Sequence, residues 1–305
     1  MSASSLEPEP ISVADPVDAG SDTRPIVLLT RDEHANSRWL LDLEKSLVKR
    51  GAVVLVMPLS SFDRVGSNWK SVVNRVSDAA APTEVKRTMA ILRSAELHGV
   101  PTINGTSCYA IGTSKILHHE LFDVVGVASP RFVQLSSGTS PEEAMRLARE
   151  ADLHFPLLAK PNSGGFGAGI TSVRSREGLT SSVLVAALGS DGAGILQEFV
   201  APLDGFVYRV FFLGGAVQRA VRVFATELDS FNTCVCSTKF DVWECPAVVE
   251  AAVLSMATAA GADCGSVELM YDEKGTARYF DFNLLSTLPD QKAYDEMAEM
   301  VCGRR

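Results

Sequence analysis

Two acids and an amide near the C-terminus could together hold a divalent metal ion. Glu268 lies thirteen residues before Asp281, and Asn283 follows two residues later. Apolar residues surround all three, although an ordinary core excludes such side chains. Oxygen donors with no His or Cys among them suit Mg²⁺ or Mn²⁺, and Mg²⁺ usually arrives with substrate phosphates. The competing interpretation is a pair of strands with a polar face, and this segment alone leaves both open.

A hairpin of two strands would bring these oxygen donors together. Residues 267–271 are predicted to form one strand, 272–276 a turn and 277–282 the returning strand. Side chains alternate along a strand, so Asp281 and Asn283 are expected on one face.

A lysine ends an apolar strand directly before a glycine-rich loop. Residues 155–160 predict the strand, and a lone ammonium at its end, on Lys160, is costly unless an anion meets it. The loop contains Gly164, Gly165 and Gly167, and such a backbone is free to donate N–H groups to phosphates. It is no Walker A motif, because no Gly-Lys-Ser/Thr follows and it leads into a strand. The combination favours phosphate binding over a plain flexible turn.

Two further segments could contact a nucleotide. Lys115 lies at a predicted helix start, where the helix dipole disfavours lysine, so we expect an anion partner rather than only solvent. Gln197, Glu198, Phe199 and Val200 end a predicted strand. They could offer polar groups to adenine and ribose and wall the ring, but taken alone they read as an edge strand with an exposed Glu.

Two arginines are embedded in apolar strands that are predicted over 207–212 and 216–224. Arg209 and Arg222 each need a carboxylate or phosphate partner in such surroundings. They are candidates for a catalytic role, and structural salt bridges are the competing account.

Composition restricts the class of protein. The chain has 305 residues and a net charge of -9, which argues against a nucleic-acid or anionic-membrane surface. No apolar run approaches the ~20 residues of a membrane span. Residues 1–24 are acidic and rich in Ser, Pro and Ala, so we expect a disordered tail. Six cysteines without a C-x-x-C pair indicate reduced thiols and a cytoplasmic protein. A metal or redox role of Cys234, Cys236 and Cys245 is disfavoured by the C-x-C spacing but stays open.

The N-terminal region predicts a small open parallel α/β domain over 25–107. A buried strand, an amphipathic helix and a second buried strand form a β-α-β unit with a right-handed crossover. No G-x-G-x-x-G follows the first strand, which leaves a dinucleotide site little support. The elements expected here are strands at 25–30, 52–58, 72–75 and 101–104 and helices at 37–50 and 82–98.

The remaining chain alternates short strands with helices. Besides the strands already named, the expected elements are helices at 113–124, 141–150, 181–188 and 246–260, a helix after Asp290, and strands at 131–135, 170–173 and 194–200.

The order of these parts resembles the ATP-grasp superfamily, over about residues 25–300. The matching features are Lys115, Lys160 with its glycine loop, the segment 197–200, the two arginines and the acid–amide set. The RimK-like carboxylate–amine ligases are similar in their small α/β first domain and in segments 74–77 and 99–104. The resemblance implies a two-lobed ATP-grasp fold with antiparallel sheets, with an N-lobe over 108–193 and a C-lobe over 194–305.

One motif departs from those ligases. They usually carry Glu-x-Asn where this chain has Asp281-x-Asn283, and Asp-x-Asn is similar to the inositol phosphate kinase branch of the superfamily. Aspartate preserves the charge and the oxygen donors, so the departure leaves metal binding intact and puts the substrate class in doubt.

The resemblance implies a specific chemistry. ATP lies between the lobes with Lys115, Lys160 and the loop on its phosphates, while Glu268, Asp281 and Asn283 hold one or two Mg²⁺ or Mn²⁺. A substrate carboxylate takes the γ-phosphoryl group, and an amine then displaces it. The expected partners are therefore a small carboxylate and a small amine, with no nucleic acid and no membrane.

Two other functions stay open. A kinase that phosphorylates a hydroxyl of a polyol or inositol phosphate would need a basic acceptor pocket, and the acidic chain shows no dense Lys/Arg cluster. A non-catalytic nucleotide-binding module could lose the metal ligands freely, yet the set is complete. His118 and His119 are expected on a helix surface rather than in catalysis. The substrates and the oligomeric state, including a homo-oligomer, are left open.

Overall fold

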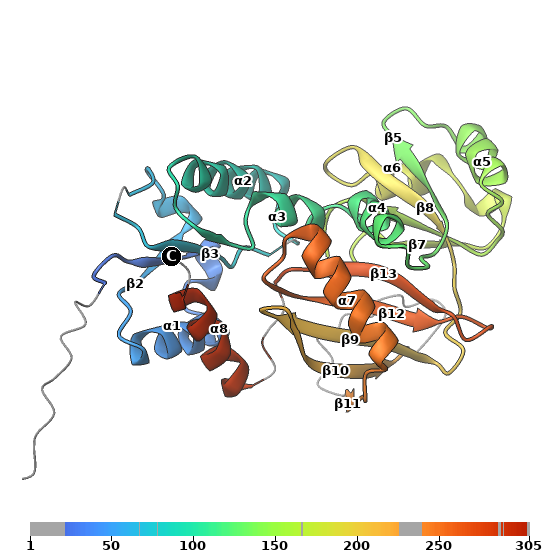
Figure 1. The fold of residues 1–305 in the computed structure, drawn as a ribbon. Coiled ribbons are helices and arrows are strands. Elements are labelled where there is room, and N and C mark those ends of the chain that lie inside the picture. Colours follow the sequence, from blue (N-terminus) through green and yellow to red (C-terminus); the bar gives the residue numbers. More distant parts are fainter. Residues whose placement is uncertain are drawn as a thin grey trace, which may run out of the picture.

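A computed structural model of the chain has three parts lying side by side (Figure 1). It describes residues 22–225 and 240–303, except residues 67, 78, 166, 286, 287 and 289. Most of the tail expected over 1–24 lies outside the described residues, as do Cys234 and Cys236 of the cysteine group. Within the described part, no helix combines the length and apolarity that a bilayer-spanning segment needs.

The first part is a parallel sheet with helices on both faces. Its strand order is β2-β1-β3-β4, and every neighbouring pair runs parallel. Successive residues of β1 enter different cores, Val27 with α2 and Leu28 with α1, because side chains alternate across a strand. The elements are β1 (Ile26–Thr30), α1 (Arg38–Lys49), β2 (Val54–Pro58), β3 (Ser71–Asn74), α2 (Pro82–Leu97) and β4 (Thr102–Ile103), with 3-10 turns η1 (Asp32–His34) and η2 (Leu59–Ser61).

The C-terminal helix α8 (Gln291–Gly303) returns to this first part. Tyr294 and Met297 join the core beneath α1, and Ser46 Oγ of α1 donates a hydrogen bond of 2.8 Å to Asp295 Oδ1. Figure 1 shows the red α8 beside the blue α1. The last helix of the chain therefore packs mainly on the N-terminal domain, and its core also includes Leu213 of β9 (Phe206–Leu213) and Cys264 of β12 (Cys264–Tyr271).

The second part is a four-stranded antiparallel sheet in the order β5-β8-β6-β7. Since β8 pairs with both β5 and β6, we propose that the boundary between the lobes follows β8, rather than preceding it at residue 193. The elements are α3 (Thr106–Gly112), α4 (Lys115–Val125), β5 (Phe132–Ser136), α5 (Pro141–Glu150), β6 (Leu157–Pro161), β7 (Thr171–Val173), η3 (Arg176–Gly178), α6 (Ser181–Leu188) and β8 (Ala193–Glu198).

The third part is a five-stranded antiparallel sheet in the order β11-β10-β9-β12-β13. Helix α7 packs against β9, β10 and β12 and covers one face. The elements are β9 (Phe206–Leu213), β10 (Ala216–Phe224), β11 (Asp241–Val242), α7 (Ala247–Ala260), β12 (Cys264–Tyr271) and β13 (Ala277–Asn283).

The helices and strands expected from the sequence are present along the described chain, and the structure adds α3 and β11, which were not expected. The helix expected over 113–124 is α4, which begins at Lys115, and the separate helix α3 ends just before it at Gly112. Ser114 caps α4, since its side chain accepts a hydrogen bond of 3.3 Å from Leu117 N. This new helix start fixes the position of Lys115.

Asn104 ties the first part to the third. It follows β4 with a left-handed φ of 52° and is buried. Its Nδ2 donates hydrogen bonds to Cys264 O at 2.9 Å and Leu284 O at 3.3 Å, and its Oδ1 accepts one from Asp263 N at 2.9 Å. A single side chain thus holds the ends of both β12 and β13 against the N-terminal domain.

Candidate active site

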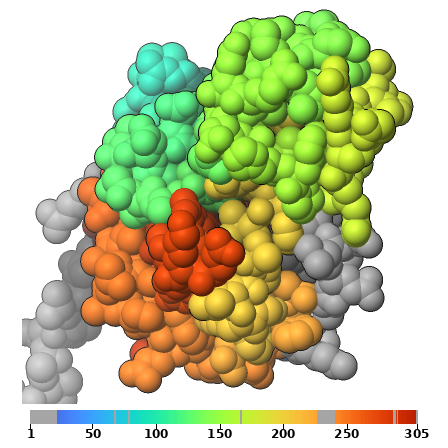
Figure 2. Space-filling model, turned by 90° about the vertical axis from the view of Figure 1, so that its right-hand side faces the viewer, coloured from blue at the N-terminus to red at the C-terminus, as the bar shows by residue number. Residues whose placement is uncertain are grey.

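A cavity of about 550 Å³ lies where the three parts meet. In the space-filling view the second part of the fold, in green and yellow-green, lies above the third part, in orange (Figure 2). The second part is called the first lobe below, and the third part the second lobe. Ligand sites for small molecules commonly have volumes of this size. The residues that line it include Lys115, His118, Lys160, Gln197, Arg209, Glu268, Phe280, Asp281 and Asn283.

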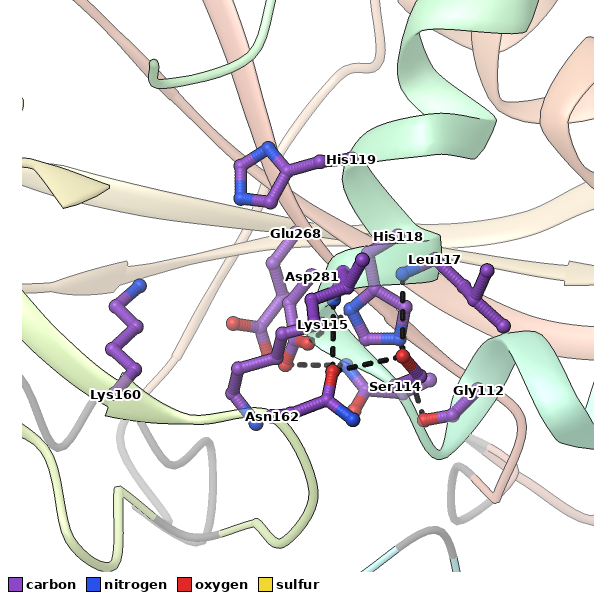
Figure 3. Close-up of polar contacts among 12 residues, drawn as sticks. Gly112, Ser114, Lys115, Leu117, His118, His119, Lys160, Asn162, Glu268 and Asp281 are labelled. Carbon is purple, nitrogen blue, oxygen red and sulfur yellow. Dashed lines mark hydrogen bonds and ion pairs between the residues drawn. The ribbon is translucent and has the colours of Figure 1, made fainter. Parts of the chain in front are cut away.

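The two acids and the amide meet on neighbouring strands. Glu268 of β12 pairs with Asp281 of β13, and Asn283 Nδ2 donates a hydrogen bond of 3.2 Å to Asp281 Oδ2. Figure 3 shows the carboxylates of Glu268 and Asp281 close together. The convergence expected from the hairpin is therefore present.

A β-bulge at Phe280 aims the second strand into the cavity. Glu268 pairs with Asp281 whereas Leu269 pairs with Tyr279, so Phe280 is the extra residue of β13. Phe280 and Asp281 both line the cavity, although strict alternation would place neighbours on opposite faces. Bulges often re-aim side chains next to active sites.

These oxygen donors suit Mg²⁺, which completes its coordination with substrate phosphates. The described residues contain no group of three or more His, Cys, Asp or Glu suited to a metal. The cavity instead offers two carboxylates and an amide oxygen, and Mg²⁺ characteristically takes one or two carboxylates together with substrate phosphates. Glu268 is buried and forms an ion pair with Arg209 of the neighbouring strand β9. That pairing stabilises the buried carboxylate without a metal.

His118 holds the other carboxylate from helix α4. Its Nδ1 lies 3.1 Å from Asp281 Oδ1, and its Nε2 lies 3.3 Å from Gly112 O (Figure 3). Burial opposes the charge of Asp281, but the hydrogen bond and charge of His118, with Lys115 and Arg209 nearby, hold the pKa of Asp281 well below its usual range. Asp281 is thus an anion fixed from both sides, by His118 and by Asn283.

The expectation that His118 and His119 lie on a helix surface is wrong. The two side chains are only 2% and 3% exposed. Helix α4 packs against β8, β13 and α7, so the helix face that carries both rings points inward. The sequence held a signal for this, since His118 precedes the buried Leu121 and Phe122 by one helical turn.

The opposite wall of the cavity carries two lysines. Lys160 is 6% exposed, and its Nζ donates a hydrogen bond of 3.2 Å to Gln197 Oε1. Burial, helped by the charge of Lys115, lowers the pKa of Lys160 to about 8. Lys115 reaches from α4 to the glycine loop, where its Nζ donates a hydrogen bond of 2.9 Å to Gly164 O. Two ammonium groups thus border the loop.

Asn162 joins the helix start to the glycine loop, and the sequence analysis missed it. Its Oδ1 accepts hydrogen bonds from Ser114 Oγ at 2.8 Å and Ile116 N at 3.1 Å, and its carbonyl oxygen accepts one from Lys115 N at 2.9 Å (Figure 3). The loop itself requires glycine, because Gly164 has a φ of 102° and a Cβ on Gly165 would lie 2.7 Å from Ala79 Cβ.

The sequence of this chain is similar to those of named ligases over stretches of different length. No family model matches the chain. It is 25% identical over 261 residues to a probable α-L-glutamate ligase of Xanthomonas euvesicatoria pv. vesicatoria (strain 85-10), over 82% of this chain and 86% of that protein. It is 28% identical over 129 residues to a D-alanine–D-alanine ligase of Xanthomonas axonopodis pv. citri (strain 306), but this match spans only 42% of the chain and 39% of that ligase.

Solved structures agree over nearly the whole chain. The D-cycloserine synthetase DcsG superposes with a TM-score of 0.68 at 17% identity, over 90% of this chain and 99% of that one. The ATP-grasp ligase PsnB, in a complex with a precursor variant, Mg and ADP, has a TM-score of 0.64 at 16% identity, over 92% and 98%. This chain has the ATP-grasp fold. The predicted fold class and the resemblance stated from the sequence are confirmed, and the proteins named here are ligases rather than kinases.

The segment 197–200 between the two lobes contains three residues that line the cavity and one that does not. Gln197, Phe199 and Val200 line the cavity. Glu198 is not part of the lining, because its carboxylate accepts hydrogen bonds from Arg131 N at 2.8 Å and Arg131 Nε at 2.9 Å. Any contact of Glu198 with a nucleotide would therefore come from its backbone.

The two candidate arginines of the ATP-grasp lobe face opposite sides of the sheet. Arg209 pairs with Val221 across β9 and β10 and faces the cavity, so Arg222 points to the other face. There Arg222 forms an ion pair of 3.4 Å with Asp241 and packs over Phe206 at 4.4 Å. The structure does not bring it to the cavity. Counting the register back from the Gly214–Gly215 turn would have placed both arginines on one face, and the irregularity between Val217 and Arg219 shifts the register by one residue and turns Arg222 away.

Several basic groups reach the cavity from distant parts of the sequence. Arg75 of the N-terminal domain is fully buried and Arg219 of β10 packs on Phe240 at 4.9 Å. Neither was among the site residues expected from the sequence. The described lining contains five Lys and Arg residues against two carboxylates, and it suits a polyanion within an acidic chain. These cations are Arg75, Lys115, Lys160, Arg209 and Arg219.

Proposed function

We propose that this protein is an ATP-dependent ligase that joins a carboxylate to an amine and releases ADP and phosphate. The observation that carries the proposal is one cavity with an oxygen-donor set on β12 and β13 and a buried lysine with a glycine loop opposite it. Ligase activity of the similar proteins supports the same class.

The proposed reaction has two steps. A substrate carboxylate oxygen attacks the γ-phosphorus of ATP, and the bond from that phosphorus to the β–γ bridging oxygen breaks. ADP leaves with the bonding electrons, and the substrate becomes an acyl phosphate. The amine lone pair then attacks the acyl carbon, phosphate leaves with the bonding electrons, and the amine loses a proton. The reaction needs no nucleophilic side chain.

The cavity residues have separate proposed roles. Lys115, Lys160 and the glycine loop bind the phosphates, where charge-assisted hydrogen bonds are strong. Glu268, Asp281 and Asn283 would hold Mg²⁺ or Mn²⁺, which neutralises charge on the phosphoryl oxygens when bound. Arg209 adds a positive charge beside Glu268.

The product balance tests this proposal. The protein is incubated with Mg²⁺, ATP and pools of small carboxylates and amines, and ADP, free phosphate and condensed product are measured. We expect equal amounts of all three, dependent on both pools. ADP accompanied by a phosphorylated hydroxyl compound, without free phosphate, would replace the ligase with a kinase.

Replacing Lys160 by Met should weaken ATP binding roughly tenfold to a hundredfold at pH 7, because a charged hydrogen bond is lost. The ammonium is present below its pKa of about 8 and is lost as the pH rises through that value. Wild-type affinity, measured by calorimetry with a non-hydrolysable ATP analogue, should therefore fall above pH 8, and the variant should lack this step.

The control for Lys160 is Lys292→Met, on the exposed face of α8. It should bind the analogue like the wild type at every pH. An unchanged dissociation constant in Lys160→Met would remove the phosphate role of Lys160.

A further inference from the structure

A chain of hydrogen bonds runs from His119 of helix α4 through Gln197 to Lys160. Lys160, Lys115 and the glycine loop form the side of the cavity that is proposed to bind phosphates, here called the phosphate wall. His119 Nε2 lies 3.3 Å from Gln197 Oε1, which also accepts the hydrogen bond from Lys160 Nζ at 3.2 Å. On its other side, His119 Nδ1 lies 3.2 Å from Ser129 Oγ. His119 also stacks on Phe132 with ring centroids 4.2 Å apart.

The chemistry of these groups fixes every proton in the chain. An ammonium only donates, so the atom of Gln197 that faces Lys160 is its oxygen. That oxygen only accepts, so His119 carries its proton on Nε2, and its Nδ1 accepts from the Ser129 hydroxyl. Burial, helped by the charge of Lys160, lowers the pKa of His119 to about 3, so the ring is neutral at physiological pH.

We propose that His119 is a positioning residue, which fixes the Gln197 amide with its oxygen toward Lys160 and thereby holds the Lys160 ammonium at the phosphate wall. The inference rests on the proposed nucleotide site. Without the His119 proton, the Gln197 amide can rotate and turn its NH₂ group toward Lys160, where two donors face each other. Lys160 then loses its acceptor in a buried position.

Within the described part of the chain, no group other than Gln197 accepts a hydrogen bond from Lys160 Nζ. Phe280 lies with its ring centroid 6.0 Å from Lys160 Nζ, Lys115 repels the ammonium, and the charge of Asp281 attracts it from β13. Gln197 is itself 2% exposed and is held on β8 between β5 and β6. The backbone of Gln197 is therefore fixed, while its side-chain amide can rotate, and His119 determines which atom of that amide faces Lys160.

Three variants separate the hydrogen bond from the shape of the ring. His119→Phe keeps an aromatic ring to stack on Phe132 but has no donor. His119→Gln places an amide nitrogen at the reach of Nε2 and restores the donor, whereas the amide of His119→Asn reaches only as far as Nδ1. Folding of each variant is checked by thermal unfolding.

The readout is the dissociation constant of a non-hydrolysable ATP analogue with Mg²⁺, measured by calorimetry, and needs no ligase substrate. We expect a five- to tenfold weaker binding for His119→Phe and His119→Asn, with recovery in His119→Gln. The loss of affinity with rising pH should begin at a lower pH in His119→Phe, because Lys160 without its acceptor has a lower pKa.

A double-mutant cycle with Gln197→Leu decides whether His119 acts through Gln197. In that background His119→Phe should have no further effect on binding. A fivefold loss in both backgrounds, or equal affinity and pH profile in the wild type and His119→Phe, would overturn the positioning role. A wild-type protein that binds no adenine nucleotide would instead overturn the proposed function.

Discussion

Asp281→Asn should lower the turnover of the protein at least about a thousandfold, because it removes one of two carboxylate charges that the metal requires. The amide keeps an oxygen of similar size, so packing around β13 should persist. The substitution also removes the anion that His118 faces at 3.1 Å. ADP release is the activity measurement, and binding of Mn²⁺ in the presence of ADP, followed by electron paramagnetic resonance, is the direct one.

Asp42→Asn provides the matched control for Asp281. Asp42 lies on α1 and is not part of the cavity lining, and Arg38 Nε is 3.8 Å from its Oδ2. This variant should keep wild-type turnover and Mn²⁺ affinity. Full activity with unchanged Mn²⁺ binding in Asp281→Asn would remove the metal assignment from β13.

Local sequence signals were sufficient for the hairpin that carries the metal ligands. The turn of residues 272–276 is closed by Asp272, whose Oδ1 accepts hydrogen bonds from Lys274 N and Thr276 N, and Gly275 has a φ of 74°. Such chemistry depends on neighbouring residues and can be predicted from them. The bulge at Phe280 could not, because it is a property of the pairing between two strands.

Other features depend on which surfaces meet, and a single sequence does not contain that information. Helix α8 is amphipathic, but its apolar face could cover either the second lobe or the N-terminal domain, and it packs on α1. The cavity gathers its cations from separate elements, so no Lys/Arg cluster appears in the sequence. The spacing of Leu121 and Phe122 indicated which face of α4 is buried, but not that β13 and β8 would cover the face with His118 and His119.

Asn104→Ala is expected to lower the free energy of unfolding by about 3–5 kcal/mol, because it leaves several buried backbone groups without their partner. The side chain bonds Cys264 O, Leu284 O and Asp263 N. Alanine also tolerates the left-handed backbone at 52° less well than asparagine does. Urea unfolding, followed by circular dichroism, measures the loss.

Two variants separate the backbone from the side chain at Asn104. Asn104→Gly relieves the left-handed strain, so any loss it shares with Asn104→Ala belongs to the hydrogen bonds. Asp152→Ala changes the other non-glycine residue described with a left-handed φ, at 53°, but on the surface, and it should cost only about 1 kcal/mol. Because Leu284 directly follows Asn283, loss of the Asn104 bond should also weaken Mn²⁺ binding at the end of β13. If Asn104→Ala lowered the free energy of unfolding by less than about 1 kcal/mol, the packing of α3 and α8, and not this side chain, would hold the N-terminal domain to β12 and β13.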